Sequence, residues 1–199
     1  DVARLATEYD AIVATYYPTV EWLAPITPQA GRPARGYYIQ DFEPNFLAPG
    51  TESYQRAWDS YTLIPNLVRF TKTEWNRDEV KSQTGADCHV VGASVNTDLF
   101  RPRPRSGPEW PEGPLRIAAM IRVGTPWRAP RLTMEVLKLA YKRYHSAVEI
   151  LLFGTSLDDP RFAALPRSFP WKLAGLLSQR QVASFLNDAD LFVDFSTYQ

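Results

Sequence analysis

Two arginines stand six residues apart in a loop between a strand-like and a helix-like segment. The apolar run 115–121 ends at Arg122, and a short loop with Gly124 and Thr125 leads to Arg128. In an open α/β sheet, the end of a strand and the start of the next helix form the usual anion-binding corner. Because each guanidinium presents a fixed fork of donors, two of them can hold both phosphates of a diphosphate. The alternative is a pair of solvated arginines on a surface loop.

The elements that would position this loop are strands and helices in alternation. Several strand-like segments are continuous runs of Val, Ile, Leu and Phe, which is typical of strands covered on both faces. They span residues 11–16, 36–40, 67–70, 89–92, 115–121, 148–153 and 191–195. Capping-box patterns at residues 71–74 and 178–181 predict the starts of two helices. This alternation predicts an α/β fold with two Rossmann-like parallel-sheet units.

A proline-rich segment, residues 101–114, divides the two patterns. Prolines fix φ and lack an N–H donor, so they favour an extended connector. We therefore predict one unit over residues 1–104 and a second over residues 105–199; a long surface loop within one sheet is the alternative. The chain begins without methionine and stops four residues after its last strand-like segment. We expect a fragment of a longer protein, with both units incomplete.

Composition argues against several classes of function. The net charge is zero, so nothing indicates a nucleic-acid partner bound by bulk charge. One cysteine and two distant histidines make a structural zinc site improbable. Asp188-Ala189-Asp190 matches the Asp-x-Asp of metal-dependent transferases. However, Asp188 ends a predicted helix and Asp190 begins a strand, so we interpret the pair as turn chemistry and expect no metal site.

Three segments together resemble the retaining glycosyltransferases of the GT-B fold, family 4, also called glycosyl transferase group 1. Residues 90–102 resemble the passage between the family's two domains, with Ser94 and Asn96 where Gly and Asp are more usual. Arg122 and Arg128 fit the family's Arg and its following Lys or Arg, which hold the donor diphosphate. Residues 175–196 are similar to the family's nucleotide-base loop, helix and final strand. The order and spacing of the three segments are more specific than any one of them.

The resemblance implies transfer of a sugar from a nucleotide donor, with retention at the anomeric carbon. The donor, a dTDP-, UDP- or GDP-sugar, would be a co-substrate, and no tightly bound cofactor is expected. The acceptor would be a growing glycan or a lipid-linked sugar, in the cytoplasm or at the inner face of the membrane. Arg122 and Arg128 would stabilise charge on the leaving diphosphate, as catalysis requires. The implied donor-binding residues are Gly124, Thr125, Leu173, Gly175, Leu177, Thr197 and Tyr198.

A narrower resemblance concerns the expected acceptor side. Residues 37–44 resemble a branch of the family that includes rhamnan-type rhamnosyltransferases, which makes dTDP-rhamnose the first choice of donor. Gln40, Asp41 and Glu43 follow a strand-like segment, where ligands of parallel sheets bind. We expect these three residues to bind the acceptor; a solvated polar loop is the alternative.

The chain also departs from the family pattern. The family's Gly-Phe-Gly segment and its two glutamates spaced as E-x7-E would follow the last strand, and the chain ends before them. The family's N-terminal glycine-rich loop is not visible either, so we expect this fragment to be catalytically incomplete. Two other functions stay open: a non-catalytic module that binds a nucleotide or glycan, and an epimerase of the same two-domain architecture.

Overall fold

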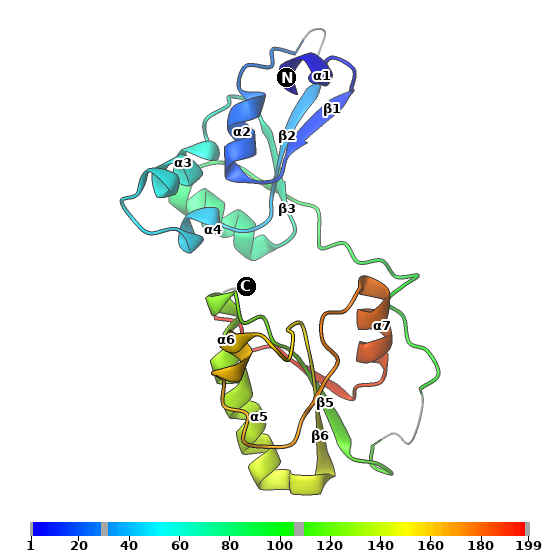
Figure 1. Ribbon diagram of the computed structural model, residues 1–199. Coiled ribbons are helices and arrows are strands. Elements are labelled where there is room, and N and C mark those ends of the chain that lie inside the picture. Colours follow the sequence, from blue (N-terminus) through cyan, green and yellow to red (C-terminus); the bar gives the residue numbers. More distant parts are fainter. Residues whose placement is uncertain (1, 29–31, 106–109, 198–199) are drawn as a thin grey trace. The chain divides into compact units, whose positions relative to one another are not determined.

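The computed structural model describes residues 2–28, 32–105 and 110–197. The chain divides into two compact units, residues 1–94 and 95–199. Residues 95–104, which the sequence assigns to the first unit, therefore belong to the second. Each unit contains one four-stranded, all-parallel sheet with helices packed against it (Figure 1). The predicted α/β class with two Rossmann-like parallel-sheet units is confirmed.

Each predicted strand-like segment overlaps a strand. Unit 1 consists of α1 (Val2–Ala6), β1 (Ala11–Ala14), α2 (Tyr17–Leu23), β2 (Ala34–Ile39), η1 (Glu43–Phe46), α3 (Glu52–Ser60), β3 (Val68–Thr71), α4 (Glu74–Thr84) and β4 (His89–Val90). Unit 2 consists of β5 (Leu115–Met120), η2 (Pro126–Arg128), α5 (Pro130–Tyr144), η3 (His145–Ala147), β6 (Val148–Phe153), α6 (Pro160–Ala163), β7 (Lys172–Leu173), α7 (Gln179–Asn187) and β8 (Leu191–Val193). β2 begins before its predicted segment 36–40, and β3 ends after its predicted segment 67–70. The short strand β7 has no counterpart among the predicted segments.

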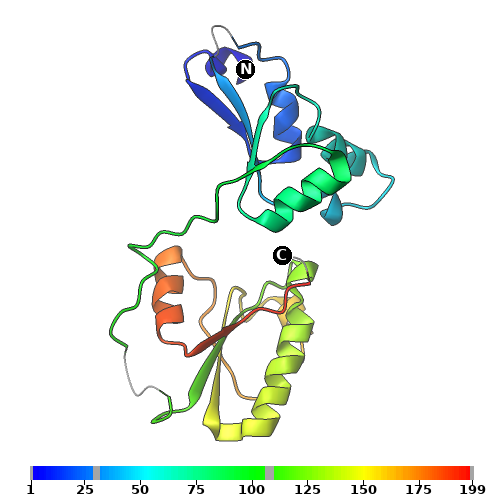
Figure 2. The same ribbon diagram turned by 180° about the vertical axis from the view of Figure 1, so that it is seen from behind.

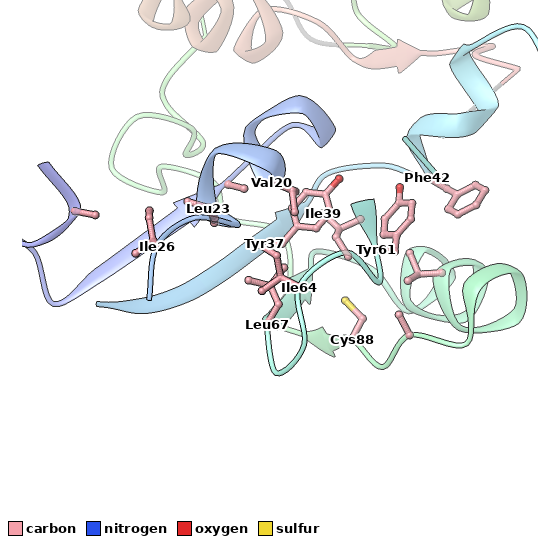
Figure 3. Close-up of a cluster of buried hydrophobic side chains, with 14 residues drawn as sticks. Val20, Leu23, Ile26, Tyr37, Ile39, Phe42, Tyr61, Ile64, Leu67 and Cys88 are labelled. Atoms are coloured by element: carbon pink, nitrogen blue, oxygen red, sulfur yellow. The ribbon is translucent and has the colours of Figure 1, made fainter. Parts of the chain in front are cut away.

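The sheet of unit 1 is wound in one direction. Its strand order is β1-β2-β3-β4, and successive right-handed crossovers in one direction place their helices on the same face. Helices α2, α3 and α4 accordingly lie on one side of the sheet (Figures 1 and 2). The fully buried Tyr37 and Ile39 of β2 pack there with Val20 of α2 and with Tyr61 (Figure 3). This core holds the ends of β1 and β2 in place.

The sheet of unit 2 is wound in both directions. Its order is β7-β6-β5-β8, so the chain steps outward through α5 and α6 and then returns through α7 to place β8 beside β5. Helices α5 and α6 cover one face and α7 covers the other (Figures 1 and 2). The point where the winding reverses lies between β5 and β8. In doubly wound sheets, ligands bind outside the carboxyl ends of the strands at this switch point.

The proline-rich segment before residue 106 is attached to unit 2. The backbone N–H of Arg103 donates to Asn187 Oδ1 at 2.8 Å, and Asn187 Nδ2 donates to the Arg103 carbonyl at 3.1 Å. Arg105 Nη1 lies 2.8 Å from Asp190 Oδ1, and the other oxygen of Asp190 accepts the Arg116 N–H. Asp188 is the C-cap of α7. The two aspartates therefore have separate structural roles at a turn.

Across residues 2–28, 32–105 and 110–197, no helix is both long enough and apolar enough to span a lipid bilayer.

Candidate functional site

The loop after β5 carries both arginines of the predicted anion site. Ile121 is fully buried, and its N–H donates to the Phe153 carbonyl at 2.7 Å, which fixes the start of the loop. The Thr125 N–H donates to the Arg122 carbonyl at 3.0 Å and closes a tight turn through Gly124. The Arg128 N–H then donates to the Thr125 carbonyl at 3.0 Å within η2. Local hydrogen bonds thus hold Arg122 and Arg128 at the switch point.

The segment after β8 forms the other side of this corner. Arg128 Nη1 lies 3.3 Å from Ser196 Oγ and 3.6 Å from Asp194 Oδ2. The Thr197 N–H donates to the Trp127 carbonyl at 2.8 Å. Arg128 Nε is buried and has no hydrogen-bond partner among the described residues. Arg128 is therefore held between two segments and keeps an unused donor.

Arg122 has a different environment from Arg128. Its side chain is exposed, and within the described part of the chain it has no hydrogen bond or ion pair. The Arg122 guanidinium is thus unpaired among the described residues, whereas that of Arg128 is held by Asp194 and Ser196. We call residues 122–128 and 194–197 the arginine corner.

The remaining residues that the sequence predicts to bind the donor lie in two places. Gly124, Thr125 and Thr197 belong to the arginine corner. The Gly175 carbonyl accepts the Gly154 N–H at 2.8 Å, so Gly175 lies at the same edge of the sheet, beyond β6. Leu173 on β7 packs against the core of unit 2, and Leu177 is partly exposed before α7. Tyr198 lies outside the described residues.

A third arginine reaches the corner from α6. The Asp159 carboxylate caps this helix and holds Arg161, accepting from its N–H at 2.8 Å and from Nη2 at 2.8 Å. A Cβ built on Gly124 would lie 3.1 Å from Arg161 Nη1, so Gly124 leaves room for that guanidinium. The sequence did not predict a role for Arg161. The sequence pattern around it indicates a helix cap at Asp159, and this pattern carries no information about contact with Gly124.

The predicted acceptor residues lie together in unit 1. Gln40, Asp41 and Glu43 line a cavity of about 230 Å³ at the carboxyl ends of β1 and β2. The cavity is completed by Tyr16, Tyr17, Phe46 and Leu47. Gln40 also connects neighbouring segments at the strand ends. Its side-chain Nε2 donates to the Thr15 carbonyl at 2.9 Å, and its backbone carbonyl accepts a hydrogen bond from Asn76 Nδ2 at 2.9 Å. The three residues thus share one site.

Glu43 is the most perturbed group in this cavity. Its Oε2 accepts the Tyr17 N–H at 2.8 Å and the Tyr37 hydroxyl at 3.2 Å, and its own N–H donates to the Tyr61 hydroxyl at 3.1 Å. Burial raises the pKa of Glu43 to about 7, more than these two hydrogen bonds lower it, and the charge of Asp41 adds to the rise. Near neutral pH this carboxyl can therefore hold or release a proton.

Comparison with known proteins gives one distant relative and no family assignment. No protein-family model matches the chain. The chain is 28% identical over 170 residues to the O-antigen biosynthesis protein RfbC of Myxococcus xanthus, an alignment that covers 84% of this chain and 12% of that protein. The chain thus spans about one eighth of the length of this relative.

Proposed function

We propose that this chain is part of a glycosyltransferase of polysaccharide biosynthesis, which moves a sugar from a nucleotide-diphosphate donor to a growing glycan or lipid-linked acceptor. The observation that carries the proposal is the pair Arg122 and Arg128 at the switch point of unit 2, where ligands of doubly wound sheets bind. The name of the relative, O-antigen biosynthesis protein, supports a role in glycan biosynthesis.

The arginine corner suits a leaving diphosphate. Breaking the bond between the anomeric carbon and the donor oxygen leaves negative charge on the diphosphate, and fixed cations stabilise that charge more in the transition state than in the ground state. Arg122 would bind it directly. Arg128 would exchange Asp194 and Ser196 for phosphate oxygens. Two guanidinium groups supply the positive charge that a divalent cation supplies in metal-dependent transferases.

The finer assignment rests on the motif resemblance. It comprises a retaining enzyme of GT-B family 4, dTDP-rhamnose as donor, and an acceptor bound at the cavity of Gln40, Asp41 and Glu43.

The test is a calorimetric titration of the chain with UDP, GDP and dTDP at physiological salt. Hydrogen bonds between charged groups contribute about 1.5–3 kcal/mol each, so the double variant Arg122→Ala/Arg128→Ala should bind the preferred nucleotide more than about 100-fold more weakly. Arg143→Ala is the matched control. Arg143 lies in the last turn of α5, at the opposite end of that helix from the corner, and should leave the affinity unchanged.

Two results would contradict the proposal. Equal nucleotide affinity in the double variant and the wild type would remove the arginine corner as the diphosphate site. Binding of none of the three nucleotides would show that this chain carries no donor site. A correctly folded double variant, checked by its NMR amide spectrum, excludes unfolding as the cause of a loss.

A further inference from the structure

The cavity in unit 1 has acidic and aromatic walls. Two of its lining residues, Asp41 and Glu43, carry carboxyl groups, and its lining includes no lysine, arginine or histidine. The guanidinium of Arg56 on α3 is paired with Glu21, with Nη2 2.7 Å from Oε2. An anionic ligand would therefore meet the like charge of Asp41, while the Arg56 guanidinium, which acts on Tyr16 and Tyr17, is already paired with Glu21. This disfavours binding of an anion.

Only one oxygen of Glu43 is engaged by the protein. Oε2 takes both hydrogen bonds, from the Tyr17 N–H and the Tyr37 hydroxyl. Oε1 has no partner among the described residues, and Glu43 lines the cavity, so Oε1 is the oxygen left for a ligand. A protonated Oε1 can donate to a hydroxyl oxygen, and a sugar hydroxyl can accept that bond.

The groups that face Glu43 are uncharged apart from Asp41. Tyr17 from α2, Tyr37 from β2 and Tyr61 after α3 surround it. Burial raises the pKa values of Tyr37 and Tyr61, so both hydroxyls stay neutral near neutral pH. With no cation beside it, the Glu43 carboxyl is itself neutral on the acidic side of its pKa of about 7.

The apolar part of the wall is suited to a sugar ring. Tyr16 is half exposed, and its ring centroid lies 4.8 Å from that of Tyr17 in an edge-on arrangement. Phe46 and Leu47 add apolar surface. The volume of about 230 Å³ is below the roughly 300–1,000 Å³ that holds drug-sized ligands, which limits the occupant to about one sugar residue.

We infer that this cavity binds one uncharged sugar residue, that the protonated Glu43 Oε1 donates a hydrogen bond to a sugar hydroxyl, and that acidic sugars are excluded. This inference deepens the acceptor side of the proposed function and rests on it. A bound sugar removes the remaining water from Glu43, which disfavours its ionised form further. Affinity for the sugar is therefore constant at acidic pH and falls as Glu43 ionises.

The experiment is an NMR titration of the full chain with the methyl glycosides of rhamnose, mannose and glucose at pH 6 and pH 8. Methyl glucuronide is the acidic counterpart of the glucoside, and methyl glucosaminide is the cationic one. At least one neutral glycoside should shift the amide signals of Tyr17 and Glu43, and its affinity should fall by up to about tenfold between the two pH values. The glucuronide should bind at least about tenfold more weakly than the best neutral glycoside.

Glu43→Gln keeps the shape of the side chain and removes its ability to ionise. The amide imitates the protonated acid, so this variant should keep the pH 6 affinity within about threefold and lose the pH dependence. Glu52→Gln, which changes an exposed carboxylate on α3, is the matched control and should keep the wild-type pH dependence.

Four outcomes would overturn the inference. The first is that methyl glucuronide binds as tightly as the best neutral glycoside, and the second is that methyl glucosaminide binds more tightly than any neutral glycoside. The third is that a folded Glu43→Gln variant binds no sugar at pH 6, and the fourth is that the wild type binds none of the sugars. The titration requires no nucleotide. Failure of sugar binding in a sample that still binds a nucleoside diphosphate therefore counts against this inference alone, and failure of nucleotide binding counts against the proposed function.

Discussion

Replacement of Gly154 by alanine should destabilise unit 2 much more than replacement of Gly175, although both glycines have positive φ angles. Gly154 follows β6 with φ +93°, and Gly175 follows β7 with φ +79°. A Cβ at Gly154 would lie 3.0 Å from Met120 Cγ and 3.2 Å from the Ile121 carbonyl oxygen, whereas a Cβ at Gly175 would have no neighbour within 4 Å. The two substitutions thus share the backbone strain and differ in packing.

The expected magnitudes follow from this difference. A positive φ costs an L-residue about 1–2 kcal/mol at either position. Overpacking adds about 1–3 kcal/mol at Gly154 alone. The contact with Ile121 is hard to relieve, because that residue is fully buried and its N–H is bonded to the Phe153 carbonyl. We expect a total loss of about 2–5 kcal/mol for Gly154→Ala and about 1–2 kcal/mol for Gly175→Ala.

The assay is hydrogen exchange of the β5 and β6 amides in increasing urea, because it follows unit 2 separately from unit 1. The free energy of opening of these amides should be lower in both variants, and lower in Gly154→Ala than in Gly175→Ala. A difference between the variants below about 0.5 kcal/mol would refute the close packing at the end of β6.

Two further predictions concern charge. Asp194→Asn should raise the affinity for the preferred nucleoside diphosphate about 1.5- to 5-fold in the calorimetric titration. The reason is that a phosphate must break the half-exposed ion pair of Arg128 and Asp194, 3.6 Å apart, and such a pair contributes about 0.2–1 kcal/mol. A lower affinity in the variant would show instead that Asp194 helps to bind the nucleotide. The stability of unit 1 should fall as pH rises from 4.5 to about 7, because the folded state keeps the Glu43 proton that the unfolded chain loses. The loss is on the order of 3 kcal/mol at most, and exchange of the β1 and β2 amides should show it in the wild type and not in Glu43→Gln.

The strands could be predicted where continuous apolar runs mark them, as for β6, whose bounds equal those of the predicted segment. The positions of the strand ends could not be predicted as well, because individual side-chain hydrogen bonds determine where a strand stops. The predicted segment 191–195 ends early as β8, since Asp194 Oδ1 accepts the Ser196 N–H and turns the chain. β7 pairs with β6 through only two residues, too few for any periodic pattern.

The arginine loop could be located from sequence, because its spacing and its place between a strand and a helix are local features. The approach of Arg161 to Gly124 is a tertiary contact, and no sequence spacing encodes it. Glu43 could be named as a polar residue after a strand. Its raised pKa arises from burial beside Tyr37 and Tyr61, which the fold alone brings together.

The two sides of the arginine corner are far apart along the chain. Arg128 contacts Ser196, which lies 68 residues further on. During synthesis on the ribosome, β5, α5 and β6 emerge before β8, so the corner cannot form until β8 docks beside β5. A nucleotide that binds the corner would bind only after β8 has docked, and it would stabilise unit 2 in that state by mass action. Under the proposed function, the supply of nucleotide sugar would then also influence how much of the newly made protein survives proteolysis.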